Sequence, residues 1–169
     1  MNAKLIVSVS ALAVVLAGAA GVVAVSRLSV IKPAPEVRFN PLAGEPLSTS
    51  GLRGKVVLVS FWGTYCTPCI REMPKVVETY RKFTARGYET LAVATRHDNP
   101  HNVARFVSQH ALPFKVALDS SGEAARAFGN VRITPTVFLI DKQGRVLRRY
   151  IGQPNWPEIH ELVERELAP

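Results

Sequence analysis

The chain has only two cysteines, Cys66 and Cys69, and two residues separate them. They follow an uncharged, largely apolar run at residues 56–61 that is typical of a buried strand, and they lie where a helix is expected to begin. At a helix N-terminus, unpaired backbone N–H groups and a partial positive charge stabilise a thiolate relative to a thiol. The thiolate is the form that attacks a disulfide. The spacing therefore predicts a reversible dithiol/disulfide centre.

A purely structural role explains this pair poorly. Two cysteines are too few for a disulfide scaffold. A bridge that closes so short a loop would stabilise the fold by only roughly 2 kcal/mol. We therefore expect the two thiols to have a chemical role.

The composition indicates one globular domain with an apolar appendage. The chain has 169 residues, of which 47% are hydrophobic and 20% are charged, and its formal net charge is +8. A basic chain can bind nucleic acid, but these Lys and Arg residues are scattered and form no recognisable nucleic-acid motif. We expect no nucleic-acid partner and interpret the basic surface mainly as a solvated one; weak attraction to anionic lipid or to an acidic partner is the alternative.

The segment of residues 5–25 contains no charge and is flanked by Lys4 and Arg27. Its length matches the ~20 residues that a membrane-spanning helix needs. The alternative is a cleaved signal peptide, with residues 5–16 as the apolar region and residues 17–19 (Ala-Gly-Ala) as the cleavage site. Apolarity that continues to residue 25 favours the uncleaved anchor.

We therefore divide the chain into three parts. Residues 1–27 are a signal anchor or signal peptide, residues 28–36 are a proline-containing tether, and residues 37–169 are one domain. Both interpretations of the first part place the domain outside the cytoplasm, where disulfides persist.

The domain alternates between strand and helix patterns. Apolar pieces broken by Pro and Gly at residues 37–53 predict a small hairpin. Strands are expected at 56–61, 89–95, 114–118, 136–140 and 145–151. Helices are expected from the cysteines to about residue 86, after Asn99, at 121–128 and after Asn155. This order predicts an α/β fold with a central mixed β-sheet flanked by helices and an N-terminal hairpin extension.

The helix that begins at the cysteines carries an apolar stripe. Its members at helical spacing, which we expect to be buried against the sheet, are Ile70, Met73, Val77 and Tyr80.

Four motifs resemble the thioredoxin superfamily: FWGTYCTPC at 61–69, EMP at 72–74, ITPT at 133–136 and LIDxxG at 139–144. Within it, the chain is most similar to the TlpA/ResA/CcmG group, the membrane-tethered, extracytoplasmic thiol-disulfide oxidoreductases of bacteria. The resemblance covers about residues 37–167 and implies a thioredoxin-like fold. It also implies an inner-membrane protein with a periplasmic domain, or a periplasmic protein if the N-terminal segment is cleaved.

The resemblance assigns roles to four residues. Cys66 would be the exposed nucleophile that forms a mixed disulfide with a partner, and Cys69 would be the thiol that resolves it. Pro135 would be a cis-proline packed opposite the pair, and Thr134 would offer backbone hydrogen bonds to the partner. An ordinary proline at the start of a strand is the alternative for Pro135.

Glu72 is a candidate proton acceptor. It lies three residues beyond Cys69, so the two side chains share one face of the predicted helix. A carboxylate there could take the proton of Cys69, and its charge would oppose thiolate formation nearby, which suits a reductant. The resembled reductases have a similar acidic residue. The alternative is a glutamate that the helix dipole favours in the first turns.

The sequence also departs from thioredoxin itself, which has a buried aspartate where this chain has Ser60. Tyr65 replaces the tryptophan that usually precedes the first cysteine. With Trp62 and Thr134, Tyr65 is predicted to bind the partner, although a tryptophan at position 62 is also typical of a core. Arg96 follows a predicted strand together with His97; a solvated loop is favoured there, and a place in the partner groove is the alternative.

The predicted function is reduction of partner-protein disulfides outside the cytoplasm, in cytochrome c maturation or a similar task. An upstream thiol donor in the membrane would re-reduce the pair, and no cofactor beyond the Cys66–Cys69 disulfide is expected. A disulfide oxidase or isomerase on the same scaffold is one alternative. A Cu(I) carrier is another, because soft thiolates favour Cu(I); a zinc site fits the ligand spacing less well.

Overall fold

The computed structural model describes residues 32–169, which form the compact unit Lys32–Pro169 of the chain. The signal anchor or signal peptide predicted at residues 1–27, and the first residues of the predicted tether, lie outside the described residues. Within residues 32–169, no helix has both the length and the apolarity that crossing a membrane requires.

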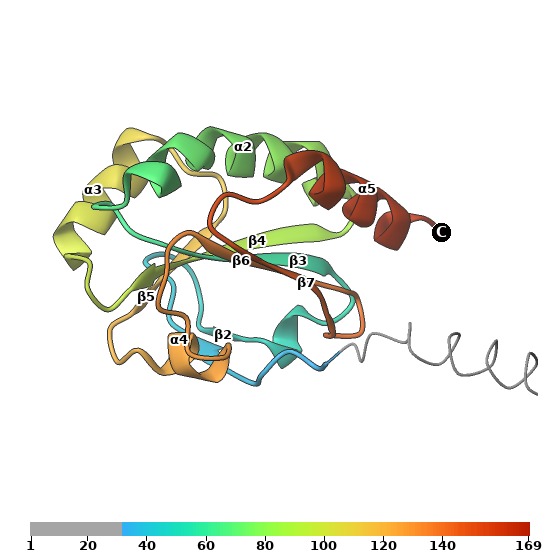
Figure 1. The fold of residues 1–169 in the computed structure, drawn as a ribbon, viewed down its shortest axis with the longest axis horizontal. Helices are drawn as coiled ribbons and strands as arrows, with labels where there is room; N and C mark the ends of the chain where they lie inside the picture. Colours follow the sequence, from blue (N-terminus) through green and yellow to red (C-terminus); the bar gives the residue numbers. More distant parts are fainter. Residues whose placement is uncertain (1–31) are drawn as a thin grey trace, which may run out of the picture. The chain divides into compact units, whose positions relative to one another are not determined.

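A mixed five-stranded sheet forms the centre of this unit, in the order β5-β4-β3-β6-β7 (Figure 1). The strands are β3 (Val56–Trp62), β4 (Tyr88–Thr95), β5 (Lys115–Asp119), β6 (Thr136–Ile140) and β7 (Val146–Ile151). The strands β3, β4 and β5 are parallel, whereas β6 is antiparallel to β3 and β7 is antiparallel to β6. The predicted mixed sheet is confirmed.

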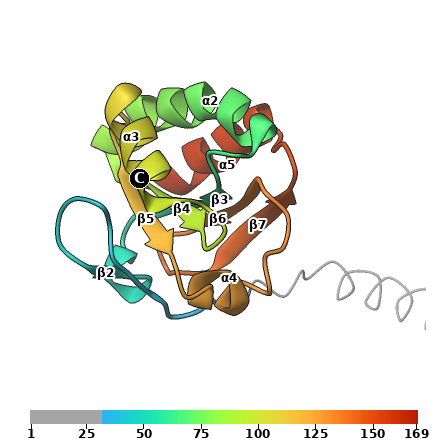
Figure 2. The same cartoon turned by 90° about the vertical axis from the view of Figure 1, so that its left-hand side faces the viewer.

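Helices cover both faces of the sheet (Figure 1 and Figure 2). One face carries α2 (Thr67–Phe83), α3 (Pro100–Gln109) and α5 (Trp156–Leu167), and the other carries the short helix α4 (Glu123–Ala127). All residues of β3 and β4 are buried. Coverage of both faces explains why the central strands are apolar without strict alternation.

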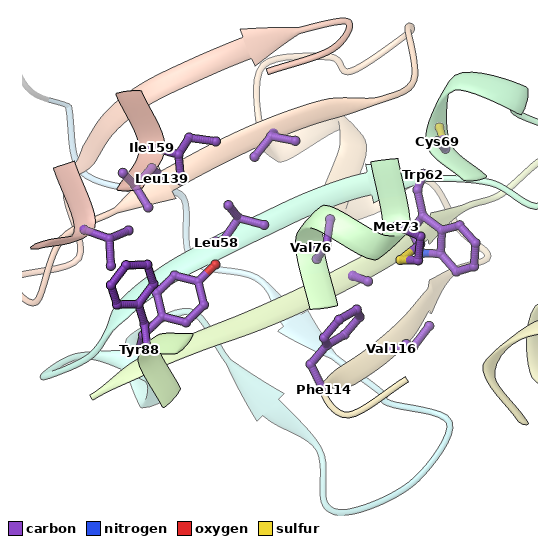
Figure 3. Packing of buried hydrophobic residues seen from close by; sticks show 14 of the residues in the cluster. Leu58, Trp62, Cys69, Met73, Val76, Tyr88, Phe114, Val116, Leu139 and Ile159 are labelled. Atoms are coloured by element: carbon purple, nitrogen blue, oxygen red, sulfur yellow. The ribbon is translucent and has the colours of Figure 1, made fainter. Parts of the chain in front are cut away.

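Alternate residues of β3 enter two separate cores. Leu58 and Trp62 face α2, α3 and α5, while Val57 and Phe61 belong to the core on the α4 side. Figure 3 shows Cys69 at the same end of the first core as Trp62 and Met73. The cysteines are therefore fixed at one end of a packed layer.

The predicted N-terminal hairpin is confirmed as the antiparallel pair β1 (Arg38–Phe39) and β2 (Leu47–Ser48). Phe39 is buried in the core on the α4 side. A one-turn 3-10 helix, η1 (Ser50–Leu52), connects the hairpin to β3.

The N-terminal residues also pair with both outer strands of the sheet. Leu42 N donates to Val116 O of β5 at 2.8 Å, and Val146 N of β7 donates to Lys32 O at 2.8 Å. The part of the predicted tether that the structure describes, residues 32–36, therefore lies against the domain, and the predicted boundary at residue 37 falls inside the packed unit.

The buried face of α2 differs from the predicted stripe. Its buried residues are Cys69, Met73, Val76, Thr79 and Phe83. Of the predicted residues, Met73 is buried, whereas Ile70, Val77 and Tyr80 are half-buried at the edge of the same core. Ile70 and Val77 line a groove of about 600 Å³ between α2 and Phe106 of α3. The apolar stripe is therefore wider than the part that the sheet covers, and helical spacing alone could not select the buried centre.

The predicted ends of the five strands of the sheet are exact or differ from the observed ends by one residue. The strand β4 begins one residue earlier than predicted, at Tyr88. The helix α2 ends at Phe83 and continues as a turn of 3-10 helix, η2 (Thr84–Arg86). Gly87 ends it with φ at 95°, a conformation that side chains with a Cβ rarely adopt.

Candidate active site

Cys66 is the N-cap residue of α2, with φ −94° and ψ 96°, and Cys69 lies in the first turn. The two form a disulfide with their Cα atoms 5.2 Å apart. Cys66 is 7% exposed and Cys69 is 2% exposed, so both are buried and Cys66 is nearer the surface. The structure thus brings together the pair that the spacing predicted.

The sulfur of Cys66 occupies the position of an N-cap acceptor. Its Sγ accepts a hydrogen bond from Cys69 N at 3.3 Å. Pro68 stands in the first turn, where a missing N–H costs nothing because no helical acceptor exists there. The N–H of Cys69 and the positive end of α2 would also stabilise a thiolate at Cys66.

The segment before β6 lies next to this sulfur. Thr134 O is 3.5 Å from Cys66 Sγ, and the Thr134–Pro135 peptide bond is cis. A disulfide sulfur has no proton to donate, so in this form the approach to Thr134 is a contact, whereas a reduced thiol could donate there. The predicted positions of Thr134 and Pro135 opposite the pair agree with this geometry.

Glu72 lines the same small cavity as Cys69. The cavity has a volume of about 10 Å³, and among its lining residues are Ser60, Pro135 and Trp156. Trp156 Nε1 donates a hydrogen bond to Glu72 Oε2 at 2.6 Å, which fixes the half-buried carboxylate beside the buried cysteine.

Sequence reasoning missed Trp156. It is the first residue of α5 and lies 84 residues from Glu72 in sequence. The Asn155 cap at the start of that helix was recognisable, and Asn155 Oδ1 accepts from Glu158 N at 3.3 Å. Nothing in the local pattern indicates that the adjacent indole reaches the active-site helix.

Asp98 was also missed, although it follows Arg96 and His97 at the carboxyl end of β4. Its carboxylate accepts from Thr64 N at 2.5 Å and from Thr64 Oγ1 at 2.6 Å. These bonds tie the loop before α3 to the loop that precedes Cys66.

The residues predicted to bind a partner differ in exposure. Tyr65 is 56% exposed, and its hydroxyl is 2.8 Å from Thr95 Oγ1. Its ring lies over Gly63, where an added Cβ would be 2.7 Å from Tyr65 Cε1. Ile133, which was not predicted, is 58% exposed just before Thr134. Tyr65 directly precedes Cys66 and Ile133 directly precedes Thr134, so these two exposed apolar side chains flank the contact between Cys66 and Thr134, and we call them the apolar rim.

Trp62 does not lie on this surface. It is 1% exposed, and its ring packs against Phe106 with the centroids 5.3 Å apart. Direct contact between Trp62 and a partner is therefore not possible in this conformation, and the core alternative describes its position. Burial follows from its place on β3, whose alternate side chains face α2 and α3.

A larger hollow of about 540 Å³ adjoins the site. Tyr65 and Thr134 line it, and so do Arg96 and His97. The favoured interpretation of these last two as merely a solvated loop was incomplete, because both side chains are exposed and also line the hollow.

Within residues 32–169, no group of three or more His, Cys, Asp and Glu side chains is arranged to hold a metal ion.

The chain matches known families and proteins over most of its length. The family model described as Redoxin matches residues 30–164. The thiol-disulfide oxidoreductase ResA of Bacillus thuringiensis subsp. konkukian is 34% identical over 139 residues, which are 82% of this chain and 79% of that protein. The protein of the same name from Geobacillus thermodenitrificans is 35% identical over 137 residues, covering 81% of this chain and 78% of the relative.

Solved structures show the same fold. The crystal structure of a thiol:disulfide interchange protein of the thioredoxin family from Chlorobium tepidum has a TM-score of 0.73 and 27% identity, covering 83% of this chain and 99% of that one. The thioredoxin domain of a thiol-disulfide oxidoreductase from Bacteroides vulgatus has a TM-score of 0.71 at 22% identity, over 83% of this chain and 99% of that one. The predicted thioredoxin-like fold is confirmed.

Proposed function

Because the chain belongs to the Redoxin family and is a protein thiol-disulfide oxidoreductase, we propose that it reduces disulfides of partner proteins, with Cys66 as nucleophile and Cys69 as resolving thiol. The observation that carries this proposal is the position of the pair. Cys66 caps α2 beside Thr134, and the more deeply buried Cys69 lines the small cavity together with Glu72.

The reaction begins with the reduced pair. The Cys66 thiolate attacks one sulfur of the partner disulfide, and the other partner sulfur leaves as a thiolate that takes up a proton. Cys69 then loses its proton and attacks Cys66 Sγ, which releases the second partner sulfur as a thiol. Two electrons pass to the partner, and the Cys66–Cys69 disulfide of the structure is the oxidised product.

The surroundings of Cys66 support its role as nucleophile. It is the more exposed of the two cysteines and lies beside the apolar rim of Tyr65 and Ile133. Exposed apolar side chains around a reactive group are typical of a protein-binding surface. The backbone of Thr134, next to Cys66 Sγ, is placed to bind an extended partner segment.

The cavity supports Glu72 as the group that receives the proton of Cys69. Its volume of about 10 Å³ is near the lower limit for one water molecule. Ser60 and Trp62 also line it, and Trp62 Nε1 has no hydrogen-bond partner within the described residues. One water held between these polar groups would carry the proton from Cys69 to Glu72.

Glu72 also bears on the direction of electron flow. A strong oxidant of this type owes its potential to a stabilised reduced form. A carboxylate beside Cys69 disfavours a second negative charge there, because like charges repel more strongly at a buried site. The pair is therefore expected to prefer the disulfide, which makes its dithiol form a reductant.

The location and pathway are part of the proposal. The uncharged segment at residues 5–25 supports a periplasmic domain, either anchored to the inner membrane or released after cleavage. A thiol donor in the membrane would then re-reduce the pair, and cytochrome c maturation or a similar task would supply the partner disulfides.

The redox potential tests the direction. We expect the purified domain, equilibrated with glutathione buffers, to have a potential well below about −180 mV. The variant Cys66→Ser is the control, because it forms no internal disulfide and should show no transition. A measured potential more oxidising than about −180 mV would contradict the reductase proposal and favour an oxidase or isomerase.

A further inference from the structure

The hollow beside Cys66 is unusual in its charge. Its lining includes Arg96, Arg126 and Arg132, which come from three different segments, against the single carboxylate of Asp119. The surrounding residues Tyr65 and Thr134 belong to the site itself. The cationic side chains therefore adjoin the place where a partner disulfide would react.

The three arginines lack ionic partners in the described part of the chain, since no carboxylate lies within 4.0 Å of their guanidinium groups. Their hydrogen bonds go to neutral acceptors. Arg126 Nη1 donates to Ser121 O at 3.0 Å, and Arg96 Nε lies 3.4 Å from His97 Nε2. With its amide oriented to accept, the Asn130 side-chain oxygen lies 3.2 Å from Arg132 Nη2 and 3.3 Å from Arg132 Nε. Because no carboxylate pairs with any of the three guanidinium groups, each keeps N–H donors for an external anion.

Asp119 does not neutralise the hollow fully. Its two carboxylate oxygens accept from Ala124 N at 3.0 Å and Ala125 N at 2.9 Å, and the residue is 6% exposed. The buried Asp119 carboxylate therefore caps the start of α4. The exposed wall of the hollow remains positive.

Gly122, whose φ of 71° favours glycine, lies beside two of the positive side chains. An added Cβ at this position would lie 3.0 Å from Arg96 Cδ and 3.2 Å from Arg126 Nη1. Two positive side chains beside one glycine do not stabilise the fold, because like charges repel. Their proximity is better explained by a ligand of opposite charge.

We propose that this hollow binds an acidic segment of the partner protein next to the target disulfide, with Arg96, Arg126 and Arg132 as the residues that select it. This inference rests on the proposed function, since it names the class of partner that the same site takes. A partner whose sulfur reacts at Cys66 passes Thr134 and Tyr65, so its neighbouring residues enter the hollow. Planar guanidinium groups suit carboxylates because they can form paired hydrogen bonds.

The volume agrees with a peptide occupant. About 540 Å³ falls within the range of 300–1,000 Å³ that is usual for ligand sites and would hold several side chains. The hollow is also continuous with the exposed surface at Arg96 and Arg132, so a folded partner could reach it without opening the domain.

A pair of matched peptides tests the proposal. Both contain one disulfide; one carries three Glu residues beside it and the other carries three Gln. We expect the reduced full-length protein to reduce the Glu peptide roughly tenfold faster at low ionic strength. The preference should shrink at high ionic strength, because salt screens exposed charges.

Two triple variants separate the hollow from the overall charge. The first replaces the hollow's arginines by Gln (Arg96→Gln, Arg126→Gln, Arg132→Gln) and should lose the preference. The control makes the same change in net charge at exposed arginines that lie outside the hollow and form no ion pair with a described residue: Arg38→Gln, Arg53→Gln and Arg105→Gln. This control should keep the preference.

Several results would overturn the proposal. If the wild-type protein reduces the two peptides at equal rates, or if both triple variants lose the preference for the Glu peptide equally, the hollow does not select acidic partners. Glutathione disulfide serves as a third substrate. If the triple variant of the hollow reduces it more slowly than the wild type but reduces both peptides as the wild type does, the hollow binds a small disulfide instead. If the wild-type protein reduces neither peptide, the reductase proposal fails. Oxidation of the two peptide dithiols by the disulfide form then measures the same preference.

Discussion

Cys66 and Cys69 are chemically identical side chains that the structure places in different surroundings. Cys66 Sγ accepts a backbone hydrogen bond and lies next to Thr134 O, nearer the surface than Cys69. Cys69 lies below it, and its cavity contains the carboxylate of Glu72. These positions support the proposed division of roles, because Cys66 is the more exposed of the two cysteines and Cys69 lines the cavity with Glu72.

Replacing Glu72 by Gln should slow the resolving step selectively. When the reduced protein meets a coloured aromatic disulfide, a first thiolate release reports the attack by Cys66 and a second reports the attack by Cys69. We expect the first to be unchanged and the second to fall about 100-fold near neutral pH, the usual minimum effect of losing a general base. At alkaline pH the second release in Glu72→Gln should approach that of the wild type, because Cys69 then ionises without a neighbouring base.

The matched control is Glu78→Gln on the same helix. Glu78 is exposed and pairs with Lys75 at 2.9 Å, away from the cavity. It should leave both releases unchanged. A Glu72→Gln protein whose second release equals that of the wild type would show that Glu72 is not the proton acceptor.

At the scale of the elements, α5 completes a site that α2 begins. Trp156, the first residue of α5, donates its indole N–H to Glu72 in α2. The same cavity also touches β3 through Ser60 and the start of β6 through Pro135. The position of the carboxylate therefore depends on how α5 packs, and under the proposed mechanism Trp156 is a positioning residue.

The variant Trp156→Phe tests this contact. It keeps most of the ring packing but removes the N–H, so the second thiolate release should slow several-fold, less than in Glu72→Gln. In the Glu72→Gln background the same change should add nothing, because residues that act through one contact are not additive. Equal slowing in both backgrounds would mean that Trp156 acts independently of Glu72.

The whole molecule has two cores on the two faces of one sheet, and the site lies at the end of the core that α2, α3 and α5 enclose. The interface of α2 with α5 holds a half-buried histidine, His160. Its Nε2 is 2.9 Å from Thr79 Oγ1, and its ring meets Phe83 edge-on with the centroids 5.4 Å apart.

The pH dependence of global stability should reveal this histidine. Burial, assisted by the positive charge of Lys82, lowers the pKa of His160 below 6.5 despite the opposing charge of Glu78. The unfolded chain therefore takes up a proton at a higher pH than the folded one, and stability falls as the pH drops below about 6.5. In urea unfolding of the disulfide form, we expect a lower free energy of unfolding at pH 5.5 than at pH 7.5.

The variant His160→Gln should flatten this profile, whereas His101→Gln, an exposed position at the start of α3, should keep it. An unchanged slope in His160→Gln would assign the acid sensitivity to other groups.

Local patterns and motifs predicted much of this architecture. The strands β3 and β6 were recognisable because their residues are almost all apolar, as is typical of strands that are covered on both faces. The disulfide pair followed from its spacing, and the positions of Thr134 and Pro135 followed from the family resemblance, since spacing alone gives no reason for a cis bond.

Contacts between distant segments could not be predicted in the same way. The bond from Trp156 to Glu72 joins residues that share no pattern, and Arg96 and Arg132 each look like an ordinary solvated charge in the sequence. The burial of Trp62 could not be predicted from the sequence either, because tryptophan is common both in cores and on binding surfaces. Only the packing of α3 against β3 decides it.

The pairing of N-terminal residues with the outer strands has a consequence for association. The backbone of Leu42 is hydrogen-bonded to β5 at Val116, and the backbone of Lys32 is hydrogen-bonded to β7 at Val146. Unpaired edge strands are templates for lasting strand-to-strand aggregation, and the exposed Arg149 further along β7 adds a charged deterrent. An enzyme that must release its partner after each exchange gains from such blunted edges, because a partner strand is less able to pair lastingly with β5 or β7.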